Sequence, residues 1–251
     1  MELACALETR GLTKKYGKFT AVENLTLKVE EGELFGFLGP NGAGKTTTIR
    51  MLTTLTPPTA GEARVGGFDI LKEPAKVRTV IGVVPQQFAL FDELTPVENM
   101  RYIGELYGMT EDEIAEHTRE LLETVELWDK KDVQAGGFSG GMKQRLSVAA
   151  GLLHEPCILF MDEPTTGLDP HSRIALRELT RKLNEEHGIT IVYTTHDMDE
   201  ADKLCNRIGI MNTAKLIEVG TPTELKKKIP RKAGKLPSLE DVFIELTTRN
   251  E

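Results

Sequence analysis

The segment Gly39-Pro-Asn-Gly-Ala-Gly-Lys-Thr46 constrains the fold of this chain more than any other feature, because it fits the pattern G-x-x-x-x-G-K-[ST]. Glycines in such a loop let successive backbone N–H groups converge on an anion, with no Cβ atoms in the way. Lys45 adds a positive charge, and the Thr46 hydroxyl offers a ligand for Mg²⁺. The apolar run 34–38 predicts the buried strand before the loop, and residues 46–52 predict the helix after it. The segment therefore predicts a phosphate-binding loop (P-loop) rather than an ordinary glycine-rich turn.

A second apolar run, residues 158–161, ends in the carboxylates Asp162 and Glu163. A strand that delivers an aspartate to the edge of a P-loop site is a common way to hold Mg²⁺ near the γ-phosphate. The adjacent Glu163 is suited to orient or deprotonate an attacking water. The alternative is a strand that ends in two solvated acids, and the P-loop upstream favours the catalytic interpretation.

Another candidate anion site begins at Ser139, which precedes Gly140 and Gly141 at the start of a predicted helix. Serine is a favoured N-cap, and the two glycines leave the first backbone N–H groups of the helix accessible. This pattern predicts either an ordinary capped helix start or a second site that binds a γ-phosphate.

The order of elements indicates an α/β protein with a helical insertion. Strand-like alternation extends from about residue 7 to 85, helical periodicity from about 90 to 152, and buried strands return after 156. Capping boxes begin helices at Thr95 and Thr110, and a helix is predicted from Asp169-Pro170 to Gly188. We expect a P-loop core with a mixed or parallel sheet and an N-terminal antiparallel β-subdomain. In this expectation the chain 1–251 is one domain, with residues 1–87 and 154–220 as the nucleotide-binding core lobe, 88–153 as a helical lobe and 221–251 as a C-terminal extension.

Composition limits the environment and the partners. The chain has 251 residues and a net charge of −8, which argues against nucleic acid as the main partner. Three dispersed cysteines have no metal-ligand spacing and indicate reduced thiols. The apolar runs are too short to cross a bilayer, and the N-terminus lacks the pattern of a signal peptide. We therefore expect a cytoplasmic protein.

Five motifs in this order make the chain resemble the ATP-binding subunit of an ATP-binding-cassette (ABC) transporter. They are the P-loop, the signature motif 139–145, the acidic pair 162–163, the segment 166–169 and the segment 195–197. The resemblance covers essentially the whole chain and implies the ABC ATPase fold, with ATP and Mg²⁺ as cofactors.

The resemblance also implies roles for single residues. Gln86 matches the glutamine that ligates Mg²⁺ and senses the membrane partner, and His196 matches the histidine that contacts the γ-phosphate. Asp169 matches the residue that couples the two sites of a dimer, a role compatible with capping a helix. Tyr16 matches the aromatic residue that stacks on adenine, unless it is simply a strand residue. The implied sites are catalytic Glu163, His196 and Lys45; metal ligands Thr46, Gln86 and Asp162; and nucleotide-binding residues Tyr16, Gly39, Pro40, Asn41, Gly42, Ala43, Gly44, Lys45, Thr46, Thr47, Gln86, Ser139, Gly140, Gly141 and Asp169.

In the family that the chain resembles, two subunits associate head to tail and enclose two ATP molecules between the P-loop of one and the signature motif of the other. Binding closes the homodimer, and hydrolysis reopens it. The details of the P-loop region and the C-terminal Pro237–Phe243 resemble the drug-resistance or multidrug exporter branch. The implied partner is an integral-membrane permease, which would hold the chain peripherally at the inner face of the cell membrane.

Several points stay open in the sequence. The run Phe88–Phe91 predicts either a docking patch for the membrane subunit or packing of the helical lobe, and the basic residues of 226–235 predict a solvated linker or a lipid contact. Phe138 and Ala214 stand where the family usually has leucine and glycine. The rival functions are a non-transport ATPase that acts as a scaffold motor, for example in iron–sulfur assembly, and a module that binds ATP without hydrolysing it.

Overall fold

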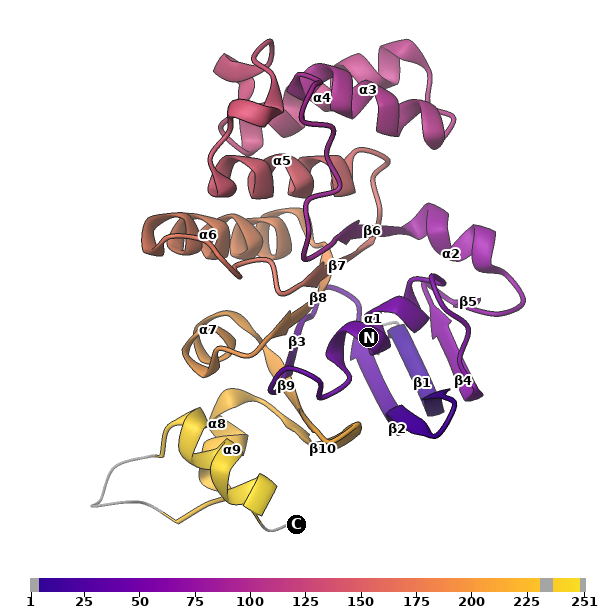
Figure 1. Ribbon diagram of the computed structural model, residues 1–251, viewed down its shortest axis with the longest axis vertical. Coiled ribbons are helices and arrows are strands. Elements are labelled where there is room, and N and C mark those ends of the chain that lie inside the picture. The colour runs from indigo at the N-terminus through magenta and orange to yellow at the C-terminus, as the bar shows by residue number, and fades with distance from the viewer. Residues whose placement is uncertain (1–4, 231–236, 249–251) are drawn as a thin grey trace.

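Two β-sheets and the helices around them form the chain, and the computed structural model describes residues 5–230 and 237–248 (Figure 1). The larger sheet has the strand order β10-β9-β3-β8-β7-β6, and the smaller one β2-β1-β4-β5. In the larger sheet only β10 is antiparallel to its neighbour, so this sheet is mixed, and the smaller sheet is antiparallel throughout. The strands are β1 Cys5–Tyr16, β2 Phe19–Glu30, β3 Leu34–Leu38, β4 Ala60–Val65, β5 Phe68–Asp69, β6 Ile81–Val84, β7 Ile158–Asp162, β8 Thr190–Thr195, β9 Arg207–Asn212 and β10 Lys215–Gly220.

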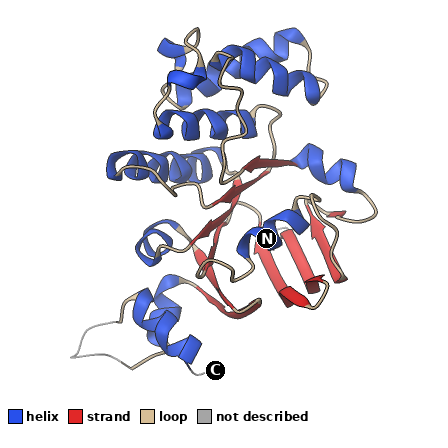
Figure 2. Cartoon of the chain, viewed as in Figure 1, coloured by secondary structure: helices blue, strands red, loops and turns tan. Residues whose placement is uncertain are grey.

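The helices gather largely on two sides of the larger sheet, as Figure 2 shows. They are α1 Lys45–Leu52, α2 Pro74–Val80, α3 Pro96–Leu106, α4 Glu111–Thr124, α5 Gly140–Leu152, α6 Pro170–His187, α7 Met198–Leu204, α8 Pro222–Lys227 and α9 Leu239–Thr248, with short 3₁₀ turns at Trp128–Lys130 and Ala135–Gly137. Of the helices in residues 5–230 and 237–248, none combines the length and the apolarity needed to span a bilayer.

The central strand β3 is buried along its whole length because both faces of the sheet are covered. Leu34 and Leu38 pack into a core that includes residues of α5, α6 and α7. Phe35 and Phe37 point to the other face and pack into a core formed with α1 and the smaller sheet. Because the side chains of β3 alternate between the two faces of the sheet, α5 and α1 pack in different hydrophobic cores.

The helix ends follow the predicted capping signals. Thr95 and Thr110 both form complete capping boxes, Asp169 caps α6, and Gly188 ends α6 in the left-handed conformation. The predicted α/β architecture, with an antiparallel N-terminal subdomain and helices between the strands, is confirmed.

The C-terminal region packs on the core through α8 and α9. Ser238 and Asp241 hydrogen-bond reciprocally and begin α9, as predicted for this segment. Lys226 and Lys228 pair with Asp202 and Glu218, so these two lysines belong to the folded surface. Lys227 lies exposed at the end of α8. The other basic residues of this region, Arg231, Lys232 and Lys235, lie outside the described residues.

Candidate nucleotide-binding site

The P-loop lies between β3 and α1 and requires glycine for steric reasons. A Cβ atom on Gly39 would lie 2.2 Å from the carbonyl oxygen of Met211. Gly44 has a φ of +108°, and a Cβ atom there would lie 2.5 Å from the carbonyl oxygen of Ala21. Glycine at these positions therefore lets the loop approach neighbouring backbone closely. Without Cβ atoms in the way, the N–H groups of the loop stay accessible for an anion.

Lys45 begins α1, and its side chain is only 3% exposed. Its ammonium group donates hydrogen bonds to the carbonyl oxygens of Gly39 (2.7 Å) and Pro40 (3.1 Å). It also forms an ion pair with Glu163 at 3.0 Å. Since a buried ammonium group needs such partners, these contacts hold the Lys45 charge beside the loop.

Asp162 ends β7 and is buried beside the start of α1. Its Oδ1 atom accepts hydrogen bonds from the hydroxyls of Thr46 (3.1 Å) and Thr194 (2.7 Å). The parallel neighbours β7 and β8 therefore bring Asp162 to the P-loop, although 116 residues separate it from Thr46 along the chain.

Glu163 follows directly and adopts a φ of +46°, which is unusual for a residue with a side chain. Besides Lys45, it contacts His196, whose Nδ1 atom lies 3.2 Å from Glu163 Oε2. Burial raises the pKa of the Glu163 carboxyl, but the hydrogen bonds and charges of Lys45 and His196 outweigh this effect and hold its pKa below the usual range. The carboxylate is thus ionised at neutral pH, as a general base requires.

A pocket of about 350 Å³ opens at the P-loop. It brings together Lys45, Thr46 and Glu163 with Gln86, which the sequence connects to them only through the resemblance. The residues that line it are Phe19, Ala21, Asn41, Gly42, Gly44, Lys45, Thr46, Thr47, Gln86 and Glu163.

Phe19 is a pocket residue that the sequence analysis missed. It is 63% exposed and lines the pocket, whereas Tyr16, 48% exposed, does not line it and lies beside the ammonium group of Lys14. Tyr16 and Phe19 are paired across the turn between β1 and β2, so their side chains share one face of the hairpin. The place of Phe19 at the pocket follows from the hairpin register, for which the sequence alone carried no signal.

Ser139, Gly140 and Gly141 do not line this pocket. Ser139 caps α5 by accepting a hydrogen bond from the Met142 N–H group (3.2 Å). A Cβ atom on Gly141 would lie 2.3 Å from the hydroxyl of Ser172, so α5 and α6 pack closely at this point. Asp169 caps α6 and accepts hydrogen bonds from the backbone N–H groups of His171 and Ser172. The signature motif and the P-loop pocket are therefore separate parts of one chain.

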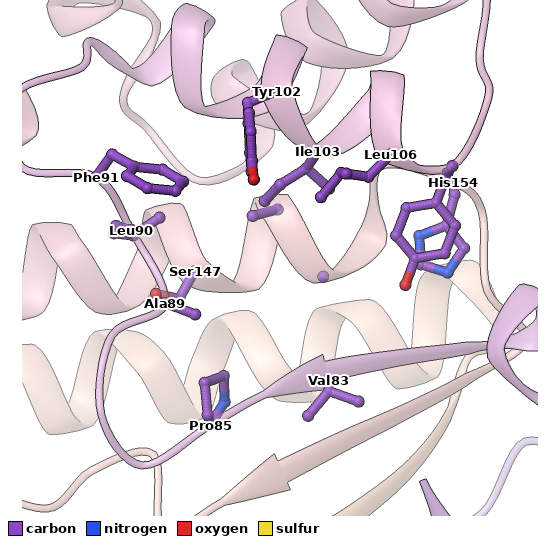
Figure 3. A pocket seen from close by; sticks show the side chains of 13 residues that line it. Val83, Pro85, Ala89, Leu90, Phe91, Tyr102, Ile103, Leu106, Ser147 and His154 are labelled. Atoms are coloured by element: carbon purple, nitrogen blue, oxygen red, sulfur yellow. The ribbon is translucent and has the colours of Figure 1, made fainter. Parts of the chain in front are cut away.

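A second cavity, of about 500 Å³, lies between β6, the segment after it, α3 and α5 (Figure 3). Its lining is mainly apolar: Val83, Pro85, Ala89, Leu90, Phe91, Tyr102, Ile103, Leu106, Tyr107, Ser147, Ala150, Gly151 and His154. Three residues of the run Phe88–Phe91 line it. Phe91 packs edge-on against Tyr102, with ring centroids 4.8 Å apart, and remains half-exposed.

The sequence profile described as "ABC transporter" matches residues 22–166, which include the P-loop, the signature motif and the acidic pair. The chain belongs to the ABC transporter family. An ABC transporter relative, the linearmycin resistance ATP-binding protein LnrL of Bacillus subtilis, is 44% identical over 223 residues, or 89% of this chain and 71% of the relative. The daunorubicin/doxorubicin resistance ATP-binding protein DrrA of Streptomyces peucetius is 44% identical over 224 residues, or 89% and 68% of the two chains.

Among solved ABC structures, the chain is similar to a dimeric ATP-binding cassette in a post-hydrolysis state bound to ADP and Pi. The two are 31% identical, with a TM-score of 0.76 over 86% of this chain and 98% of that one. The fold is accordingly the ABC ATPase fold, and the chain is an ATP-binding subunit of an ABC transporter and an ATPase.

Proposed function

We propose that two copies of this chain associate head to tail and hydrolyse ATP at their interface, and that the closing and opening of this dimer drives a membrane transporter. One observation carries the proposal: the P-loop pocket contains Lys45, Thr46, Gln86 and Glu163 but not Ser139. The capped start of α5 is a second anion-binding feature that its own chain leaves unused. A second copy completes both sites by bringing its Ser139–Gly141 segment to the γ-phosphate held by the first. ATP then stabilises the closed pair, because it binds the assembled pair more tightly than the separate chains.

In this site Glu163 is the residue that orients and deprotonates the attacking water. Lys45 and His196 stabilise the negative charge on the γ-phosphate, and the P-loop N–H groups hold the phosphates. Entry of the phosphates requires Lys45 to exchange its contact with Glu163 for a phosphate oxygen, which frees the carboxylate for water.

A bound Mg²⁺ ion would neutralise charge on the β- and γ-phosphates. The oxygen atoms of Thr46, Gln86 and Asp162 fit this hard cation, and Thr46 and Asp162 are already hydrogen-bonded to each other.

We assign the apolar cavity beside Phe91 to the docking of the integral-membrane subunit, because exposed aromatic and aliphatic side chains surround a hollow there. This contact would hold the chain peripherally at the inner face of the membrane. We assign residues 1–87 and 154–220 to the core lobe, 88–153 to the helical lobe and 221–251 to a C-terminal extension. The residues that line the cavity come from both lobes, so it lies between them. Two resistance proteins among the relatives favour export as the direction of transport.

The Glu163→Gln variant tests the proposal, because it removes the base and keeps the shape of the side chain. Size-exclusion chromatography with light scattering should detect a dimer of this variant with Mg-ATP and a monomer without it. The turnover of the variant should be about 10²- to 10⁴-fold lower than that of the wild type. Equal turnover of both proteins would show that Glu163 is not the base. A variant that binds ATP and stays monomeric would mean that closure needs the membrane subunit, and the measurement then moves to the assembled transporter.

A further inference from the structure

Glu200, on α7, is a buried carboxylate that does not line the P-loop pocket. It is 4% exposed and accepts hydrogen bonds from three hydroxyls. The Tyr193 hydroxyl donates to Oε1 (2.9 Å), and the hydroxyls of Thr195 (2.6 Å) and Thr165 (3.1 Å) donate to Oε2. Between residues 5 and 230 and in 237–248, no lysine or arginine pairs with it. Because an unpaired buried carboxylate is costly, these hydroxyls are held in donating orientations toward Glu200.

Two of the three donors adjoin residues that we assign to catalysis. Thr195 immediately precedes His196, and the backbone N–H group of Asp197, on the other side of His196, donates to the Thr195 hydroxyl (3.0 Å). Thr165 lies in the turn that begins at Glu163. A single oxygen atom of Glu200 therefore connects the strand end that carries His196 to the turn that carries Glu163.

The turn at Glu163 needs support from its surroundings. Its left-handed backbone, with a φ of +46°, is strained and persists only where neighbouring groups hold it. The N–H group of Glu163 donates to the Thr194 hydroxyl (2.9 Å) on β8, and the hydroxyl of Thr165 donates to Glu200. The carbonyl oxygen of Thr195 also accepts a hydrogen bond from the N–H group of Gly39 (3.3 Å), so the same strand end contacts the P-loop.

We propose that Glu200 is a positioning residue for ATP hydrolysis, which holds His196 and the Glu163 turn in one relative arrangement. The proposal rests on the catalytic roles proposed above for Glu163 and His196. A purely packing role would not require an acceptor oxygen shared by two segments, whereas Oε2 of Glu200 accepts hydrogen bonds from both Thr195 and Thr165. The phenol of Tyr193 remains a donor at all ordinary pH values, because burial raises its pKa well above the usual value and the Glu200 charge adds to this effect.

The kinetic test compares Glu200→Ala, Glu200→Gln and Thr195→Val, with Tyr193→Phe as the matched control. Tyr193→Phe removes a donor to the same carboxylate but leaves the contacts of Thr195 and Thr165 in place. The turnover number should fall on the order of 10- to 100-fold in Glu200→Ala and Thr195→Val, since misplacement by about 1 Å has effects of this size. The Kd for ATP should change by less than about threefold, because no P-loop residue is replaced and the hydrogen bond from Gly39 to Thr195 uses a backbone carbonyl oxygen that the variants keep. Glu200→Gln keeps an acceptor oxygen and should recover most of the turnover, and Tyr193→Phe should stay within about twofold of wild type.

Amide hydrogen exchange gives a readout that does not depend on turnover. If Glu200→Ala does not fold stably, Thr195→Val can be measured alone. Exchange should rise at the amides of Glu163, Thr165 and Thr166 and at residues 195–197 in both variants. An increase confined to α7, with unchanged turnover, would overturn the proposal and leave Glu200 as an anchor of that helix. Glu163→Gln and His196→Ala belong in the same assay. If they retain full turnover, the catalytic roles proposed for Glu163 and His196 fail; if they abolish turnover while Glu200→Ala and Thr195→Val do not alter it, only the positioning role fails.

Discussion

Replacement of Thr194 by valine tests whether the end of β8 holds both acidic residues of the site. Thr194 is fully buried, and its hydroxyl donates to Asp162 (2.7 Å) while it accepts from the Glu163 N–H group (2.9 Å). Valine keeps the shape of the side chain and removes both hydrogen bonds. The Glu163 N–H group retains the carbonyl oxygen of Thr194 as a partner (3.2 Å), so the main loss is the hydrogen bond to the charged carboxylate. We expect the free energy of unfolding to fall by about 2–3 kcal/mol.

Thr190→Val is the matched control, because it makes the same change in the same strand. The hydroxyl of Thr190 is buried and accepts a hydrogen bond from the Gly32 N–H group (2.9 Å), with no charged partner. This variant should lose about 1 kcal/mol and keep its turnover. Urea unfolding measures the two losses, and an assay of phosphate release should detect about a tenfold lower turnover only in Thr194→Val. The reasoning is refuted if Thr194→Val is no less stable than Thr190→Val and turns over ATP at the wild-type rate.

Three further predictions concern the surroundings of the site. Ala214→Gly should raise the melting temperature by about 1–3 °C in a thermal scan, because relief of the left-handed φ of +67° exceeds the entropic cost of glycine; an unchanged or lower value would contradict this. The pKa of Glu163 lies below its ordinary value of 4.5, so the stability it contributes is complete above that pH and is lost as the pH falls through the lower, native value. The difference in urea midpoint between wild type and Glu163→Gln should therefore be constant from pH 7 to 5 and shrink below about 4.5, and a difference that grows in acid would reverse the assigned sign. Because Phe19 lines the P-loop pocket and Tyr16 does not, we expect Phe19 to stack on adenine. Phe19→Ala should weaken binding of a fluorescent ATP analogue by about 5- to 100-fold, the range for loss of one base-stacking contact, and more than Tyr16→Ala does; the opposite order would support the contact that the resemblance implies for Tyr16.

The parts of the fold that local signals determine could be predicted from the sequence. The P-loop, its flanking strand and helix, and the capped starts at Thr95, Thr110 and Asp169 all depend on residues within a few positions of one another. Hydrogen bonds of this range depend little on the rest of the chain. The acidic pair at the end of β7 was also predictable, because an apolar run followed by two acids stays recognisable wherever the strand lies in the sheet.

The contacts that assemble the site depended on strand order and register, which a single sequence does not reveal. β8 lies between β3 and β7, so Thr194 reaches Asp162 at the end of β7 and Thr195 reaches Gly39 just after β3, although these residues are remote in the sequence. The buried ring of hydroxyls around Glu200 had no sequence signal, because a glutamate near the start of a helix is ordinary. Phe19 was missed for a similar reason, since its place at the pocket follows from the pairing of β1 with β2.

The central claim, that each ATP site combines two copies of the chain, is tested most directly by mixing two inactive variants. Lys45→Ala damages the P-loop and Ser139→Ala the signature motif. In a head-to-tail heterodimer one site carries both defects, and the other combines the intact Lys45 of one copy with the intact Ser139 of the other. The account predicts that the mixture hydrolyses ATP although each variant alone does not, with up to about a quarter of wild-type activity if the copies pair at random and the intact site works independently. A mixture that stays as inactive as its components, while light scattering shows that the two variants associate, would contradict the account.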